Sequence, residues 1–115
     1  MHPIIPDQQP PAGTPRHNPH LGIDCPPWCI TDHAERFSSA CVSRAYGARS
    51  AWACAVRDHV GVCVAIDGIK DGTSAELRLS AKEAQQLAAL SEMAGAGELA
   101  AAIRQAAADV TEAGQ

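Results

Sequence analysis

The sequence predicts a small α+β domain with an N-terminal cysteine knuckle, an antiparallel sheet of about three strands, and one or two C-terminal helices. Three observations predict this fold. Cysteines gather with a histidine between residues 24 and 41, apolar residues alternate with a period of two between residues 52 and 79, and they recur at helical spacing beyond residue 80. A length of 115 residues fits one domain.

The N-terminus is rich in proline. Six of the eight prolines lie within the first 20 residues, together with few large apolar side chains. Such a segment buries too little surface to offset the entropy of ordering it. We therefore predict a disordered Pro-rich tail over residues 1–22 and a single small domain over residues 23–113, and we expect residues 1–20 to be dispensable for folding.

The cysteine motif reads DCPPWCITDH, ends at His33, and is followed by Cys41 eight residues later. Three residues separate Cys25 from Cys29, and three separate Cys29 from His33. Zinc prefers four sulfur or imidazole ligands in a tetrahedral arrangement, and short gaps let neighbouring side chains converge on one ion. Pro27 suits the first position of a short helix, which would place Cys29 and His33 on one face.

These spacings predict one zinc ion per chain, bound by Cys25, Cys29, His33 and Cys41. The ion is expected to be structural, because four protein ligands leave no coordination position for an activated water. His20 and His59 compete with Cys41 for the fourth position. In the alternative interpretation the cysteines are unliganded thiols that pack as small apolar residues.

The segment CPPWCITDH followed by CVS resembles a group of short, uncharacterised actinobacterial proteins. Those proteins carry a CP-x-WC-x3-H signature and close with an LT-x-x-EA-x-x-LA helix. The similar segment here is LRLSAKEAQQLAAL, residues 77–90, so the resemblance covers about residues 23–94. Where that pattern has histidine, this chain has Cys41. The resemblance implies a metal site and this fold, and it implies no activity.

The strands follow from alternation. Trp52, Cys54 and Val56 alternate with small or charged residues, and apolar residues alternate again over 60–66 and 73–79. The intervening DGIKDGT contains Asp-Gly pairs, which suit tight turns and predict an antiparallel hairpin.

Two helices are expected after the strands. Ser80 and Glu83 fit a capping box at the start of the first helix, which should run to about Met93. Its expected apolar face consists of Ala84, Leu87, Leu90 and Met93 or Ala94. A second helix from Glu98 carries Leu99, Ile103, Ala106 and Val110 at helical spacing.

Composition limits the function classes. The net charge of -4 and the scattered basic residues disfavour general nucleic-acid binding. The longest strongly apolar stretch, residues 60–66, is far shorter than a membrane span, and the N-terminus lacks the pattern of a secretory signal. A cytoplasmic location is therefore expected, where cysteine clusters more often bind metal than form disulfides.

The predicted function is that of a non-catalytic, zinc-stabilised domain, a protein-binding or accessory regulatory module whose partner the sequence does not identify. Of the 115 residues 23 are alanine, so the core is small, and the Ala-rich helices offer one route to a homodimer. The alternative is a thiol-based enzyme or redox sensor that uses Cys41, Cys54 or Cys63. Cys54 and Cys63 lie on neighbouring predicted strands. A disulfide between them is one alternative, but we expect two buried, unlinked thiols.

Overall fold

The computed structural model describes residues 16–33 and 39–113, and it confirms the α+β fold. A two-stranded sheet at the N-terminus pairs β1 (His17–Asn18) with β2 (Ile23–Asp24). The main sheet has five antiparallel strands: β3 (Cys41–Val42), β4 (Tyr46–Gly47), β5 (Ala51–Arg57), β6 (Val62–Lys70) and β7 (Thr73–Leu79). The strand order is β3-β5-β6-β7, and β4 also pairs with β5.

The three long strands form two consecutive hairpins. Alternation places Ala53, Ala55, Val64 and Ile66 on the face of the sheet that contributes to the main core. The β6–β7 turn consists of Asp71 and Gly72 alone, both with positive φ (53° and 78°), as a tight hairpin turn requires. The earlier pair Asp67-Gly68 lies inside β6.

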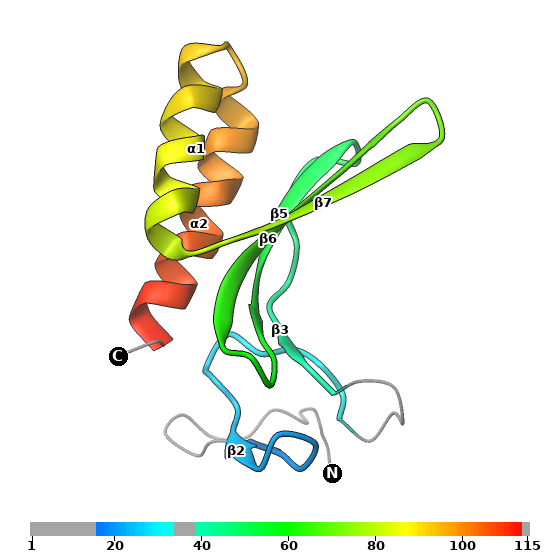
Figure 1. Cartoon of the computed structure of the whole chain (residues 1–115), viewed down its shortest axis with the longest axis vertical. Coiled ribbons are helices and arrows are strands. Elements are labelled where there is room, and N and C mark those ends of the chain that lie inside the picture. The colour runs from blue at the N-terminus through cyan, green and yellow to red at the C-terminus, as the bar shows by residue number, and fades with distance from the viewer. Residues whose placement is uncertain (1–15, 34–38, 114–115) are drawn as a thin grey trace, which may run out of the picture.

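Helices α1 (Ala81–Met93) and α2 (Gly97–Ala113) stand side by side and cover one face of the sheet (Figure 1). The predicted capping box is confirmed: the Ser80 hydroxyl accepts from the Glu83 backbone, and the Glu83 carboxylate accepts from the Ser80 backbone. The expected stripe of α2 is also present, since Ile103, Ala106 and Val110 are buried and Leu99 packs at their margin.

The predicted apolar face of α1 is only partly correct. Ala84 and Ala88 are fully buried and Leu87 packs against the core, but Leu90 and Met93 are 61% and 83% exposed. Alanine explains the difference, because two helices that approach through small residues exclude the larger side chains from their interface. These alanines therefore pack α1 against α2 of the same chain.

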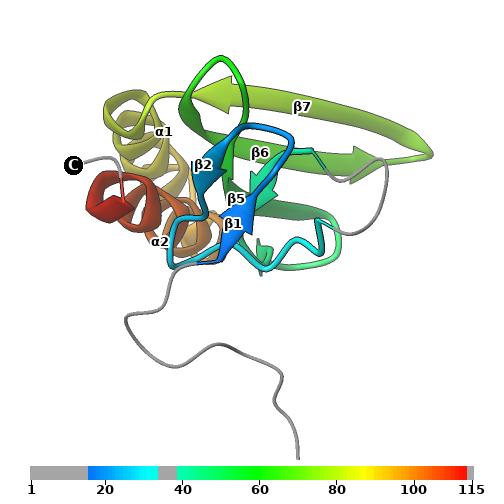
Figure 2. The ribbon, with the colours of Figure 1, turned by 90° about the horizontal axis from the view of Figure 1, so that it is seen from below.

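Residues 16–22, which composition assigns to the tail, are part of the folded chain. They form β1 and the turn that joins it to β2, with Gly22 at a φ of 67°. This hairpin lies at the opposite end of the molecule from the α1–α2 connection (Figure 1), and it stands in front of the sheet when the molecule is seen from below (Figure 2). Residues 1–15 lie outside the described part. Within residues 16–33 and 39–113, no helix has the length and apolar character needed to cross a membrane.

Candidate metal centre

Four residues from three short segments meet near the end of the sheet where Cys41 pairs with Arg57. Cys25 directly follows β2, Cys29 and His33 lie in the next loop, and Cys41 begins β3. Their Sγ and imidazole nitrogen atoms all lie within 4.8 Å of one another, close enough to hold a metal ion. The predicted set therefore comes together in space, and Cys41 completes it.

The short helix predicted from Pro27 does not form. Residues 27–28 make a turn, closed by the Cys29 amide donating to the Pro26 carbonyl at 3.0 Å. Beyond the turn the chain runs beside β3: Ile30 donates to the Val42 carbonyl at 2.9 Å, and the Val42 amide donates to the Thr31 hydroxyl at 3.0 Å. These bonds to β3 replace the bonds that a helix would make.

Two separations within the cluster can be compared with those around a tetrahedral metal ion. The His33 Nε2 atom lies 3.5 Å from the Cys29 sulfur and 3.6 Å from the Cys41 sulfur. Zn–S and Zn–N bonds of about 2.3 and 2.0 Å at tetrahedral angles give a sulfur–nitrogen separation of about 3.5 Å. All four side chains are buried, with exposures of 7%, 6%, 9% and 0% in chain order. The donor set thus fits a closed, four-coordinate site.

Asn18 supports this cluster from β1. The side chain is fully buried, and its amide donates to the Cys41 sulfur at 3.2 Å and to the Ser39 carbonyl at 2.9 Å. Its carbonyl oxygen accepts from the backbone of His20 and Leu21. Outer contacts of this kind orient ligands and tune metal affinity. The residue therefore links the hairpin to the ligand set.

Arg16 fixes the loop between the ligands. Its guanidinium donates to the backbone carbonyls of Cys29, at 2.9 Å, and Thr31. The Arg16 carbonyl in turn accepts from the Cys25 amide. One residue thus holds the chain around two of the predicted ligands.

The three sulfurs differ in their tendency to ionise. Burial raises the pKa of the Cys25 thiol to about 12, and the neighbouring Cys41 and Cys29 sulfurs add to that rise. Burial also raises the pKa of Cys41, although the Asn18 amide opposes it. At Cys29 burial acts in the same direction, but hydrogen bonds from the Thr31 backbone and His33 outweigh it, so the pKa is lowered. Thiolates rather than thiols bind metals, so the lowered pKa of Cys29 favours its metal-binding form.

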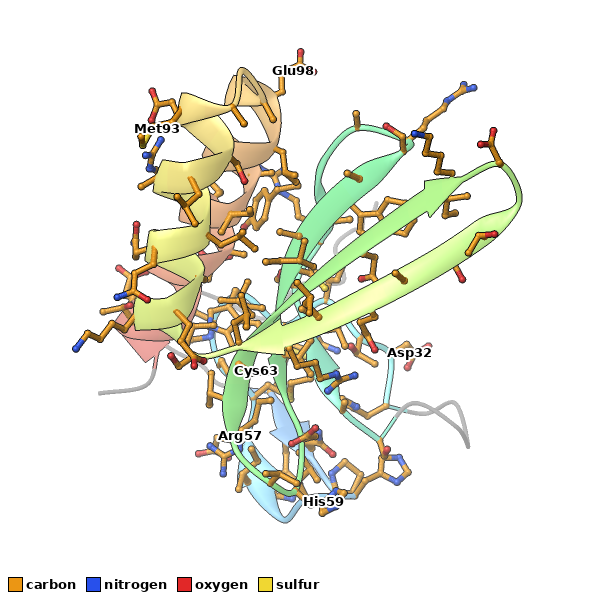
Figure 3. All side chains as sticks on the ribbon, turned by 45° about the horizontal axis from the view of Figure 1, so that its top comes forward. Asp32, Arg57, His59, Cys63, Met93 and Glu98 are labelled. Carbon is orange, nitrogen blue, oxygen red and sulfur yellow. The ribbon has the colours of Figure 1, made fainter. Side chains whose placement is uncertain are left out.

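The competing histidines occupy other positions. The Nε2 atom of His20 lies 3.2 Å from the His33 carbonyl, so His20 contacts the backbone of a predicted ligand and is not part of the four-residue group. His59 is exposed in the β5–β6 turn, at the tip of that hairpin (Figure 3). Its neighbour Asp58 accepts from the Val60 and Gly61 amides of the same turn.

Cys54 and Cys63 lie on the face of the sheet opposite the helices, in a small apolar cluster with Val56 and Ala65. They occupy diagonal positions in the β5–β6 register and are free thiols. Burial raises the pKa of Cys54 to about 11 and also raises that of Cys63. Nucleophilic and redox chemistry needs the thiolate, so this environment favours packing over reactivity.

A cleft of about 360 Å³ opens between the metal cluster and the C-terminal part of α2. Trp28, on its wall, packs against both the cysteine cluster and the main core. Tyr46 donates a hydrogen bond to the Asp109 carboxylate, and the Arg44 guanidinium lies 5.3 Å from the Tyr46 ring. Trp28 thus joins the metal cluster to the main core.

Sequence reasoning did not identify Asn18 and Arg16 as supporting residues. The sequence does contain a turn signal there: an Asn18-Pro19 pair followed by Gly22, which indicates a hairpin inside the proline-rich segment.

Comparison of the chain with protein-family models, with curated proteins and with solved structures found no match.

Proposed function

We propose that this chain is a zinc-stabilised, non-catalytic domain in which Cys25, Cys29, His33 and Cys41 bind one structural zinc ion. The observation that carries the proposal is the convergence of four buried ligand atoms within 4.8 Å. Sulfur and imidazole donors in this number favour zinc over harder cations such as magnesium or calcium. When bound, the ion supplies cross-linking and charge neutralisation to the thiolates.

The role of the chain's own residues is then structural. Four protein ligands complete a tetrahedral shell, so the site keeps no open position for substrate or activated water. Asn18 orients the Cys41 sulfur, and Arg16 holds the loop that carries Cys29. By binding all four side chains, the ion would hold together segments whose strands, β1, β2 and β3, are only two residues long.

Because the proposed site has no open coordination position for substrate or water, we assign the domain an accessory, protein-binding role. We place partner contact at the cleft beside the metal cluster, where Trp28 and the 63% exposed Ile30 offer apolar surface next to Arg44 and Asp109. A reducing compartment such as the cytoplasm suits a site that needs free thiols. The resemblance of residues 23–94 to small actinobacterial proteins is part of this proposal.

Metal analysis tests the proposal. We expect the purified full chain to contain about one zinc per chain and to release it to a chelator, with three of its five cysteines protected from alkylation until then. Cys29→Ser should lose zinc, whereas Cys63→Ser, which alters a free thiol elsewhere, should retain it. A Cys29→Ser protein with full zinc content would refute the site.

The assignment of partner contact to the cleft needs a separate test. Trp28 lines the cleft, so its fluorescence should report occupation by a candidate peptide. Ile30→Asp should abolish that response without changing zinc content, because Ile30 is exposed and is not a ligand. An unchanged response in Ile30→Asp would place the partner elsewhere.

A further inference from the structure

Strand β7 forms an open edge of the main sheet. It pairs with β6 on one side, and within residues 16–33 and 39–113 no strand pairs with its other side. All of its residues except Leu79 are exposed, and its pairing with β6 runs without a bulge from Val64–Leu79 to Lys70–Thr73. The tip of the β6–β7 hairpin also projects away from the helices (Figure 1). A long, regular edge without proline is a template for pairing with another strand.

The turn determines which backbone groups of β7 point outward. In a two-residue hairpin the flanking pair, here Lys70 and Thr73, exchanges hydrogen bonds, and every second pair after it does the same. The residues between those pairs direct their N–H and C=O groups away from β6. On β7 these are Ser74, Glu76 and Arg78.

The charges on this edge are not balanced within one chain. Glu76 lies directly opposite Asp67 on β6, a like-charge pair that destabilises a sheet. Arg78 is shared between two acids: it lies 3.1 Å from the Asp58 carboxylate and 3.7 Å from that of Glu76. On the other face of the strand, Leu77 is 53% exposed. A second cation beside Glu76 and an apolar neighbour for Leu77 would both be favourable.

We propose that β7 pairs antiparallel with β7 of a second copy of this chain, in the register centred on Leu77. In this register Glu76 of each copy lies opposite Arg78 of the other, and the two Leu77 side chains lie opposite each other. Glu76 and Arg78 are also the residues whose outward backbone groups face the partner, so each such pair exchanges two hydrogen bonds. The contact is isologous, as a two-fold dimer requires.

Neighbouring registers fail on charge or on backbone pairing. Centring on Glu76 places glutamate opposite glutamate, and centring on Arg78 places arginine opposite arginine. Centring on Ala75 leaves Glu76 opposite Ser74 and Arg78 opposite the turn. A register centred between two residues places each residue whose backbone groups point outward opposite a residue whose groups already pair with β6. The Leu77 register satisfies charge, apolar contact and hydrogen bonding together, which favours a second copy over an unrelated strand.

Charge exchange tests the register. Sedimentation of the full, zinc-loaded chain over a concentration series should show a monomer–dimer equilibrium. Glu76→Arg should weaken dimerisation by roughly 10-fold or more, because it sets arginine opposite arginine twice. The double variant Glu76→Arg with Arg78→Glu should restore the dimer, since opposite charges again face each other. Thermal unfolding at low concentration should show that each variant stays folded.

A cross-link tests the centre of the register directly. Leu77→Cys places two thiols opposite each other at the two-fold axis, at a separation that suits a disulfide. With oxidised glutathione as oxidant, it should form covalent dimers faster than wild type and faster than Leu90→Cys, a slightly more exposed position on α1. A monomer at all concentrations, dimerisation unaffected by Glu76→Arg, or equal cross-linking of the two cysteine variants would overturn the proposal.

Discussion

The described part of residues 16–43 (16–33 and 39–43) and residues 51–113 are held together by different means. In those described residues the first region has three strands of two residues each, and hydrogen bonds from side chains to backbone surround a cysteine–histidine cluster. The second has strands of seven to nine residues and helices of 13 and 17 residues around an apolar core. A cluster of proposed metal ligands lies at the centre of the first region, whereas periodic burial of apolar residues organises the second.

The two regions obtain their stability from different sources. The main core is built chiefly from alanine, valine and isoleucine, whose side chains bury little area each. A structural zinc site contributes about 10–16 kcal/mol of apparent binding free energy at neutral pH, more than the net stability of most small domains. The proposed ion would therefore contribute most to the region that has little core of its own.

The largest effect within the second region is expected from Ile103→Ala. Ile103 is fully buried at the centre of the main core, so truncation should lower the free energy of unfolding by about 2–5 kcal/mol. Urea unfolding measures this change, and Leu90→Ala, at an exposed position of α1, serves as control. Zinc content of the folded protein should stay at one per chain. Loss of zinc from folded Ile103→Ala would show that zinc binding in the first region depends on the main core of the second, which contradicts the account.

Asn18→Ala should affect the first region through the metal. The change removes the donor to the Cys41 sulfur, and loss of such outer contacts commonly lowers metal affinity 10–100-fold. Competition with a chelator of known affinity measures the change. Ser43→Ala is the matched control, because Ser43 is also buried and hydrogen-bonded, to Arg44 and Ala55, but does not touch a sulfur. Equal zinc affinity in the two variants would contradict the supporting role of Asn18.

The smallest effect is expected at the start of α1. Glu83→Ala removes half of the capping box and should cost about 0.5–1 kcal/mol, whereas Glu83→Gln should preserve most of the cap. Thermal unfolding distinguishes the two variants. Both should bind zinc as wild type does, since α1 lies outside the first region. A Glu83→Gln variant as unstable as Glu83→Ala would show that the reciprocal hydrogen bond is not what stabilises this helix start.

The same contrast explains what sequence could predict. The hairpins, the capping box and the stripe of α2 follow from local periodicity, and the four clustered residues follow from the spacing of residues that zinc prefers. Asn18 and Arg16 lie outside any periodic pattern, and their contacts span 13 to 23 residues. The helical spacing of Leu90 and Met93 predicts that they face the core, but both are exposed because the neighbouring alanines set how closely α1 approaches α2.

Amide hydrogen exchange, with and without a zinc chelator, tests the central claim most directly. The account predicts that chelation removes protection from the described amides of residues 16–43, while β5, β6, α1 and α2 keep most of theirs. Cys63→Ser protein should behave as wild type does, because that thiol is outside the cluster. Equal protection of residues 16–43 in both conditions, or equal loss across residues 51–113, would contradict a metal-organised region beside a self-supporting one.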